Sequence, residues 1–288
     1  MIASKCDILI IGSTGMLGNT LLRYFKFKNK YDVIGTCRDS NVPSKLKHLE
    51  QSIIRNLDIE NEDVLINSLQ KYNPKIVINC VGLVKQIDSS SDPIKAININ
   101  SLFPHKLNNL CKKIDAKLIH ISTDCVFDGE RGGYIESDIP NAKDLYGKSK
   151  NLGEVTFANS ITLRTSIIGH EIETSHSLLE WFLSQNDEIK GYKNAIFSGL
   201  PTVVLADVIH NYVIPNKSLS GLYHISSDPI NKYDLLKLIA KQYKKEIKII
   251  PDEELVIDRS LNSDKFKKST GFTPLPWKDM IHHMYKFR

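Results

Sequence analysis

Tyr146 and Lys150 lie four residues apart, so on a helix their side chains face the same side. A phenol has a reference pKa of about 10 and is a poor proton donor near neutral pH. An adjacent ammonium group favours the phenolate and lowers that pKa. Such a pair is most often a solvated helix face, so a catalytic interpretation needs support from elsewhere in the chain. With that support, the pair predicts a phenol tuned to act as an acid.

A hydroxyl group suited to a substrate carbonyl lies upstream of this pair. Ser122, Thr123 and Asp124 close a β-branched run that predicts a strand over 117–122. Open α/β sheets place their ligands at the carboxyl ends of the strands. We therefore expect one of these hydroxyls to hydrogen-bond a substrate.

A glycine-rich turn follows the first predicted strand and opens an amphipathic helix. Its candidate cofactor-binding residues are Gly12, Thr14, Gly15, Met16, Leu17 and Gly18. The first glycine permits a tight turn, the turn lets backbone N–H groups approach a pyrophosphate, and the last glycine allows close helix packing. The spacing is G-x-x-G-x-x-G rather than G-x-G-x-x-G, but the strand–turn–helix context predicts dinucleotide binding. The alternative is a turn that only joins a strand to a helix.

Two further segments bear on the choice of cofactor. Arg38 lies just past the second predicted strand, where an acidic residue would bond the adenosine ribose and an arginine would accommodate a 2′-phosphate. This favours NADPH, whereas Asp39 beside it could take the ribose role and leaves NADH open. Asp58 and Ile59 follow the third predicted strand. Asp58 could meet the adenine edge or cap the helix that begins near Asn61.

Short β-branched runs alternate with longer amphipathic segments over the first 165 residues, as in βαβ units with a parallel sheet. Strands are expected at 7–11, 32–36, 52–55, 75–79, 117–122 and 161–164. Helices are expected at 16–27, 61–71, 94–114 and 145–159. Right-handed crossovers would give a doubly wound sheet whose strand ends share one crevice.

The pattern loosens after residue 165. Elements are expected there at 177–185, 203–213, 221–225, 232–244 and 276–285. We expect an NAD(P)-binding domain over residues 1–165. Residues 166–288 would form a smaller, mainly substrate-binding lobe, with some segments returning to the sheet.

Three segments carry a resemblance to a known family. They are 10–18, 119–129 and 146–150 with Gly153-Glu154. The chain resembles an extended short-chain dehydrogenase/reductase, above all the dTDP-4-dehydrorhamnose reductase family. The resemblance is dense over 7–168 and diffuse afterwards. It implies an α/β fold with a doubly wound parallel Rossmann sheet and a smaller C-terminal substrate lobe. It also implies NADPH-dependent reduction of the C4 keto group of a nucleotide-linked 4-keto-6-deoxyhexose, a step in making cell-surface polysaccharide precursors.

The family's roles carry over to matching positions of this chain. The resemblance implies that Thr123 polarises the carbonyl and that Tyr146 protonates its oxygen. Lys150 would lower the tyrosine pKa and hold the nicotinamide ribose. The segment after the fourth strand would contact the cofactor through Cys80, Val81 and Gly82.

The candidate substrate-binding residues are Val84, Lys85, Asp124, Cys125 and Trp181. The segment 79–86 lacks the family's alanine-rich run with its aromatic residue and threonine, which leaves the sugar open. Lys85 could meet a diphosphate or solvent. The helical spacing around Trp181 predicts a core position, with stacking on a sugar or base as the alternative.

Neighbouring activities remain as alternatives. Sister dehydratases carry a glutamate where this chain has Cys125, so loss of water is not expected. GDP-fucose synthases are similar in having a cysteine two residues after the catalytic hydroxyl, which leaves a 3,5-epimerase/4-reductase open with Cys125 and His170 as its acids. The methionine adenosyltransferase regulatory subunit also resembles this family, which leaves a cofactor-binding module without turnover.

Composition limits the class of protein. The 288 residues are 41% hydrophobic and 25% charged, as in ordinary globular proteins. A net charge of +5 with dispersed lysines suits an anionic small substrate, and we expect no nucleic-acid partner. No apolar run approaches the roughly 20 residues of a membrane span, so we expect no membrane partner and a cytoplasmic location. Five cysteines without a C-x-x-C pair predict reduced thiols, and we expect no metal site. A homodimer remains possible.

Overall fold

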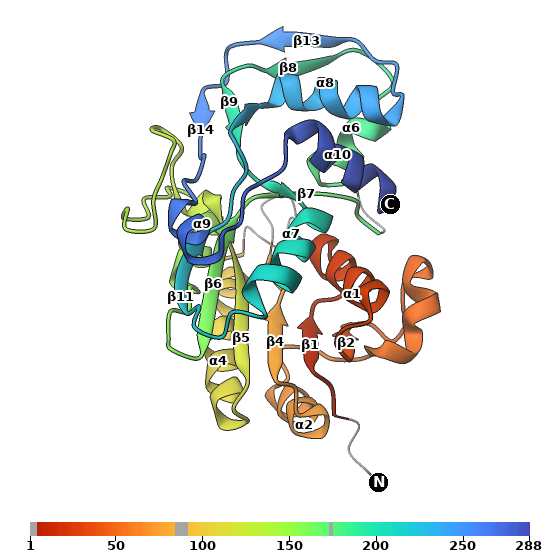
Figure 1. The fold of residues 1–288 in the computed structure, drawn as a ribbon, viewed down its shortest axis with the longest axis vertical. Helices are drawn as coiled ribbons and strands as arrows, with labels where there is room; N and C mark the ends of the chain where they lie inside the picture. Colours follow the sequence, from red (N-terminus) through yellow and green to blue (C-terminus); the bar gives the residue numbers. More distant parts are fainter. Residues whose placement is uncertain (1–4, 84–91, 173–174) are drawn as a thin grey trace. The chain divides into compact units, whose positions relative to one another are not determined.

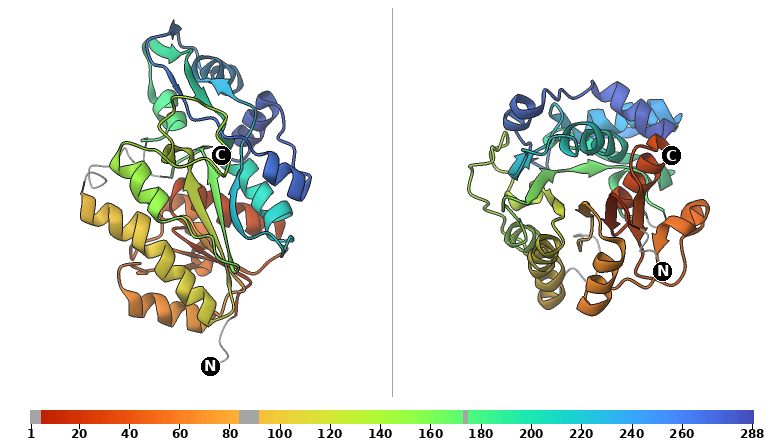
Figure 2. Two further views of the ribbon diagram at one scale, coloured as in Figure 1. Left: turned by 90° about the vertical axis from the view of Figure 1, so that its left-hand side faces the viewer. Right: turned by 60° about the horizontal axis from the view of Figure 1, so that its bottom comes forward.

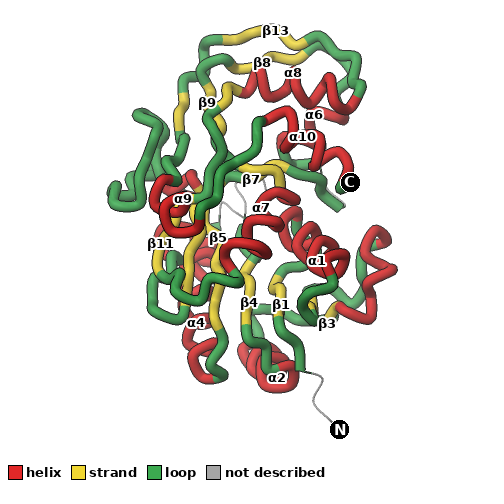
Figure 3. Tube along the Cα trace, in the orientation of Figure 1, coloured by secondary structure: helices red, strands yellow, loops and turns green. Residues whose placement is uncertain are grey.

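The computed structural model describes residues 5–83, 92–172 and 175–288, and the chain divides into two compact units (Figure 1). Unit 1 comprises 1–122, 143–163 and 218–222. Unit 2 comprises 123–142, 164–217 and 223–288. Figure 3 distinguishes the helices and strands of both units by colour.

The main sheet has seven strands in the order β11-β6-β5-β4-β1-β2-β3. Their bounds are β1 Ile8–Ile11, β2 Val33–Thr36, β3 Ile53–Ile54, β4 Ile76–Asn79, β5 Lys117–Thr123, β6 Ser160–Thr165 and β11 Gly221–His224. The pairs β1–β2, β1–β4, β2–β3 and β4–β5 are parallel, with Leu9 in register with Ile34 and with Val77. The order of the first six strands is that of a doubly wound Rossmann sheet, so the predicted fold class is confirmed.

Helices cover both faces of the sheet in unit 1 (Figure 2). On one face lies α1 (Met16–Lys28), and on the other lie α2 (Glu62–Tyr72), α4 (Phe103–Lys113) and α5 (Leu145–Leu152). Successive residues of β1 point to opposite faces, and all four are fully buried. Leu9 and Ile11 pack in a core cluster with apolar residues of α2 and α4. The sheet is therefore buried on both sides, as its continuous apolar strands require.

The helix expected at 94–114 contains a local change of geometry. It comprises α3 (Pro93–Ala96), a π-helical turn (Ile97–Leu102) and α4. Asp92 caps its start by accepting hydrogen bonds from the backbone N–H groups of Ile94 and Lys95. Wide turns of this kind often occur at functional sites.

The helix expected at 145–159 is shorter than predicted, because α5 ends at Leu152. Gly153 follows as its cap, and a Cβ atom there would lie 1.8 Å from the Asn100 carbonyl oxygen. Only glycine allows this close approach of two backbones. Asp144 begins the helix by accepting a hydrogen bond from the Gly147 N–H at 2.8 Å.

Unit 2 is built from short elements. Its helices are α6 (Leu178–Ser184), α7 (Thr202–Val208), α8 (Lys232–Tyr243), α9 (Asp264–Thr270) and α10 (Trp277–Lys286), and a π-helical turn (Ile209–Val213) extends α7. Its small sheets pair β7 (Ile167–Ile168) with β10 (Leu200–Pro201), β8 (Ile189–Tyr192) with β13 (Ile249–Asp252), and β9 (Ala195–Phe197) with β12 (Ile230–Asn231) and β14 (Ile257–Asp258). These strands of two to four residues escaped the sequence analysis because so short a run shows no periodicity.

Candidate active site

The glycine turn of unit 1 has the backbone geometry that its sequence suggests. Gly12 has a φ of +83°, a conformation that favours glycine. A Cβ atom on Gly18 would lie 2.0 Å from the Gly12 carbonyl oxygen, so this glycine lets α1 start directly against the turn. Ser13 fixes the turn to the end of β2, since its hydroxyl donates to the Thr36 carbonyl oxygen at 2.9 Å.

The amino end of α1 is suited to an anion. Gly15 at the cap is exposed, Thr14 and Met16 are half-buried, and Leu17 is buried. No acidic residue lies in the first turn of this 13-residue helix. The unpaired N–H groups and the helix dipole therefore favour a phosphate there.

The residues expected around the adenosine lie in exposed loops. The Arg38 side chain is 79% exposed, and its Nε lies 3.8 Å from an Asp39 carboxylate oxygen. Asp58 is exposed and accepts a hydrogen bond from the Glu60 N–H at 3.0 Å. The alternative in which Asp58 caps α2 is wrong, because Asn61 fills that role.

Lys150 is a buried cation of unit 1. Its residue is 4% exposed, and its Nζ donates to the Ile121 carbonyl oxygen of β5 at 2.8 Å. Burial lowers the pKa of Lys150 from 10.5 to about 8, against the opposite effects of Glu154 and Cys80. An amine of this kind can hold or release a proton near physiological pH.

Tyr146 lies one helical turn before Lys150, in the first turn of α5. It is half-buried. The backbone of this turn is held by Ser149, whose hydroxyl donates to the Tyr146 carbonyl oxygen at 3.0 Å. The structure therefore keeps Tyr146 and Lys150 on one rigid helix of unit 1.

Asn100 is a site residue that the sequence analysis missed. It lies in the π-helical turn and is 1% exposed. Its amide accepts from the Leu83 N–H at 2.8 Å and donates to the Leu83 carbonyl oxygen at 3.2 Å and to the Ser149 hydroxyl at 3.1 Å. These hydrogen bonds connect the segment after β4 to α5. No local sequence pattern identifies Asn100 as a site residue.

The segment after β4 passes close to Lys150. A Cβ atom on Gly82 would lie 3.4 Å from the Asn100 Oδ1 and 3.8 Å from the Lys150 Nζ. Cys80, Val81 and Gly82 are half-buried, and Val81 donates its N–H to the Asn79 side chain at 3.0 Å. The glycine turn and the amino end of α1, which no side chain caps, thus fit a dinucleotide on unit 1.

Thr123 is the last residue of β5 and belongs to unit 2. Its hydroxyl donates to the Asp124 carboxylate at 3.1 Å and accepts from the Cys125 N–H at 3.1 Å. Burial raises the pKa of Asp124, and hydrogen bonds oppose that effect. The approach of Thr123 to Tyr146 and Lys150, which belong to unit 1, stays a prediction.

Cys125 is half-buried in unit 2. Burial and the nearby Asp124 raise its pKa to about 12, so it is a thiol near neutral pH. His170, its suggested partner acid, has both ring nitrogens engaged, by Glu180 at 2.7 Å and by the Tyr243 hydroxyl at 2.8 Å. These features disfavour an acid–base pair made of Cys125 and His170.

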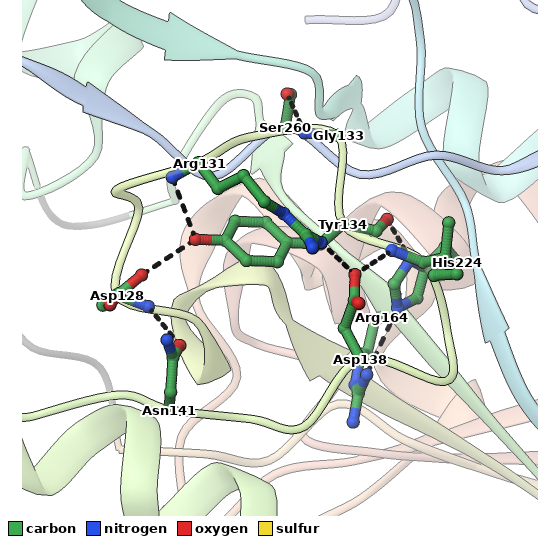
Figure 4. Close-up of polar contacts among 10 residues, drawn as sticks. Asp128, Arg131, Gly133, Tyr134, Asp138, Asn141, Arg164, His224 and Ser260 are labelled. Atoms are coloured by element: carbon green, nitrogen blue, oxygen red, sulfur yellow. Dashed lines mark hydrogen bonds and ion pairs between the residues drawn. The ribbon is translucent and has the colours of Figure 1, made fainter.

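The loop that follows Cys125 is held by contacts among its own side chains and with side chains of other elements (Figure 4). The rings of Phe127 and Tyr134 stack at 4.1 Å, and the guanidinium groups of Arg131 and Arg164 lie over Tyr134 and Phe127 respectively. The Tyr134 hydroxyl donates to Asp128 at 2.8 Å. The family motif at 126–129 therefore builds a rigid loop directly after Thr123.

The remaining expected site residues divide into two groups. Val84 and Lys85 lie outside the described residues. Trp181 is 38% exposed, so the prediction of a core position is wrong, and Leu179 and Phe182 fill the core from α6 instead. A seven-residue helix has too few turns for its spacing to identify the buried face. Within the described ranges, no three His, Cys, Asp or Glu side chains come together as a metal site.

Comparison with known proteins assigns the family. A family model described as the RmlD substrate binding domain matches residues 6–287. The chain belongs to this family. The match spans nearly all of the sequence, including the segment after residue 168 in which the resemblance is diffuse.

The proteins that this chain resembles include reductases and a subunit of methionine adenosyltransferase. The chain is 25% identical to a dTDP-4-dehydrorhamnose reductase of Aggregatibacter actinomycetemcomitans, over 96% of this chain and 97% of that protein. It is 28% identical to methionine adenosyltransferase 2 subunit beta of Danio rerio, over 82% and 73%. A Bacillus anthracis dTDP-4-dehydrorhamnose reductase solved in complex with NADP shares the fold, with a TM-score of 0.81, 21% identity and coverage of 99% and 100%. Among the described residues, no helix is long and apolar enough to cross a bilayer.

Proposed function

We propose that this RmlD-family protein reduces the C4 keto group of a nucleotide-linked 4-keto-6-deoxyhexose with NADPH, in the supply of cell-surface polysaccharide precursors. The observation that carries the proposal is the buried Lys150, which is bonded to β5 and lies one turn after Tyr146 on the unit that holds the glycine turn. A buried amine with a pKa of about 8 beside a phenol is suited to proton transfer, which favours turnover over cofactor binding alone.

The chain's own residues would divide the work as follows. The amino end of α1 binds the pyrophosphate, and Arg38 accommodates the 2′-phosphate of NADPH. When bound, NADPH would be the source of the hydride for C4. Tyr146 gives its proton to the C4 oxygen, whose double bond to carbon becomes the single bond of an alcohol, and regains a proton from solvent. Lys150 holds the nicotinamide ribose and favours the phenolate that remains, while the Thr123 hydroxyl bonds the same oxygen.

The decisive experiment is oxidation of NADPH in the presence of dTDP-, UDP- and GDP-linked 4-keto-6-deoxy sugars, followed by NMR of the product. Tyr146→Phe should lower turnover by roughly a hundredfold or more while NADPH binding persists. Tyr72→Phe, which removes a phenol hydroxyl elsewhere in unit 1, serves as the control. Tight NADPH binding without turnover on any of the sugars would refute the reductase and favour the regulatory module.

Deuterium uptake separates the simple reductase from the 3,5-epimerase/4-reductase. In heavy water, the high pKa of Cys125 and the engaged ring of His170 predict no deuterium at C3 or C5 of the product. Uptake at either carbon would select the epimerase. The homodimer and the cytoplasmic location stay predictions.

A further inference from the structure

The charge on Lys150 needs a local source of stabilisation. Its Nζ donates a hydrogen bond to the Ile121 carbonyl oxygen, and burial disfavours the ammonium form. A buried ammonium is costly unless an opposite charge or several acceptors surround it. The groups that act on Lys150 therefore decide whether it is charged when the enzyme works.

Among the described residues, titratable groups from three parts of unit 1 interact electrostatically with Lys150. Cys80 follows β4, and burial raises its pKa to about 12, so it is neutral. His120 lies on β5, and burial together with Lys150 lowers its pKa well below the usual value, so it is neutral as well. Glu154 lies just past α5 and favours the charged form of Lys150 more strongly than Cys80 does. Among these groups Glu154 contributes the negative charge.

Glu154 is also fixed in place. The Ser122 hydroxyl donates to its Oε1 at 2.7 Å. Ser122 is the residue after Ile121, so two adjacent residues of β5 are bonded to Glu154 and to Lys150. The end of α5 at Gly153 makes this possible, because the chain there passes against Asn100 and carries Glu154 back to the strand.

We propose that Glu154 is a positioning residue that keeps Lys150 protonated and, through Ser122, fixes the end of β5 immediately before Thr123. The role of Lys150 in the reaction rests on the function proposed above, but the charge of Lys150 does not. The pairing can therefore be tested with and without a substrate.

The direct test is an NMR titration of Lys150 in the full chain labelled with ¹³C at the lysine side chains. Lys150→Met assigns the signal. Glu154→Gln preserves the shape and an acceptor for Ser122 but removes the charge, and should lower the pKa of Lys150 by roughly one unit. Ser122→Ala should shift it in the same direction by less, and Glu154→Asp should restore part of the wild-type value. Glu62→Gln, which removes an exposed carboxylate of α2, should leave it unchanged.

Several results would overturn the proposal. They are an unchanged Lys150 titration in Glu154→Gln, an equal shift in Glu62→Gln, and a larger shift in Ser122→Ala than in Glu154→Gln. A purely structural Glu154 would lower the stability of the fold without moving this titration.

An activity profile adds a second readout. The alkaline loss of kcat in Glu154→Gln should move to lower pH by the same amount as the Lys150 titration, with little change of KM at neutral pH. If the wild-type protein turns over no sugar nucleotide, the proposed function fails and the titration still decides the role of Glu154.

Discussion

Replacing Lys150 by methionine should stabilise the fold at neutral pH, although it removes a residue required for turnover. The side chain is buried, and its pKa is about 8 against 10.5 for an ordinary lysine. Both folded and unfolded chains bind the proton below pH 8, so the folded state bears the full cost of the buried charge there. As the pH rises from 8 to 10.5, the folded state loses this proton first and the cost disappears. The stability of the wild type should therefore rise with pH across this window.

The size of the effect follows from the two pKa values. Their difference of 2.5 units corresponds to about 3 kcal/mol at pH 7, and the same relation leaves about 1 kcal/mol at pH 9.5. Methionine cannot donate to the Ile121 carbonyl oxygen, and losing that hydrogen bond costs about 1 kcal/mol at every pH. The informative quantity is the free energy of unfolding of the variant minus that of the wild type, followed as a function of pH. This difference should decrease by about 2 kcal/mol between pH 7 and pH 9.5.

Urea unfolding at half-unit intervals of pH measures this difference. Lys148→Met is the matched control, since Lys148 is exposed on the same helix. Its stability curve should run parallel to that of the wild type. Parallel curves for Lys150→Met as well would show that the ammonium is not buried at a cost, and would refute the reasoning about its pKa.

Three further predictions concern the glycine turn, Arg38 and His224 of β11. Gly18→Ala should abolish NADPH binding and lower stability by about 1–3 kcal/mol, since its Cβ would lie 2.0 Å from the Gly12 carbonyl oxygen. Gly15→Ala, 3.6 Å from the same oxygen, should leave the thermal midpoint close to that of the wild type. Arg38→Ser should weaken NADPH binding about tenfold and leave NADH binding unchanged by titration calorimetry; equal losses for both would contradict a 2′-phosphate contact. Burial and a nearby arginine lower the pKa of His224 to about 4. The contribution of neutral His224 to the free energy of unfolding should therefore be complete above pH 6.5 and should fall by about 3 kcal/mol as the pH drops to 4. Acid unfolding of His224→Asn should lack this loss.

Features that depend on neighbouring residues were predictable from the sequence. The glycine turn is dictated by backbone sterics within seven residues, and the spacing of Tyr146 and Lys150 by the helical period. The alternation of apolar runs with amphipathic segments likewise predicted six strands of the central sheet.

Features that depend on distant residues were not predictable from the sequence. The end of α5 at Gly153 follows from its contact with Asn100, which is 53 residues away in the chain, and Trp181 is exposed because Leu179 and Phe182 fill the core. No periodicity carries that information.

The sequence by itself determined which chemical groups the chain possesses: a phosphate-binding turn, a phenol with an amine one turn later, and a hydroxyl at the end of a strand. The tertiary structure alone decided the state of those groups. It buried Lys150 against Ile121 and set Glu154 beside Ser122, across 29 and 32 residues of chain. The physical reason is that the charge of an amine depends on its solvation and on nearby charges, and folding brings these from distant parts of the chain.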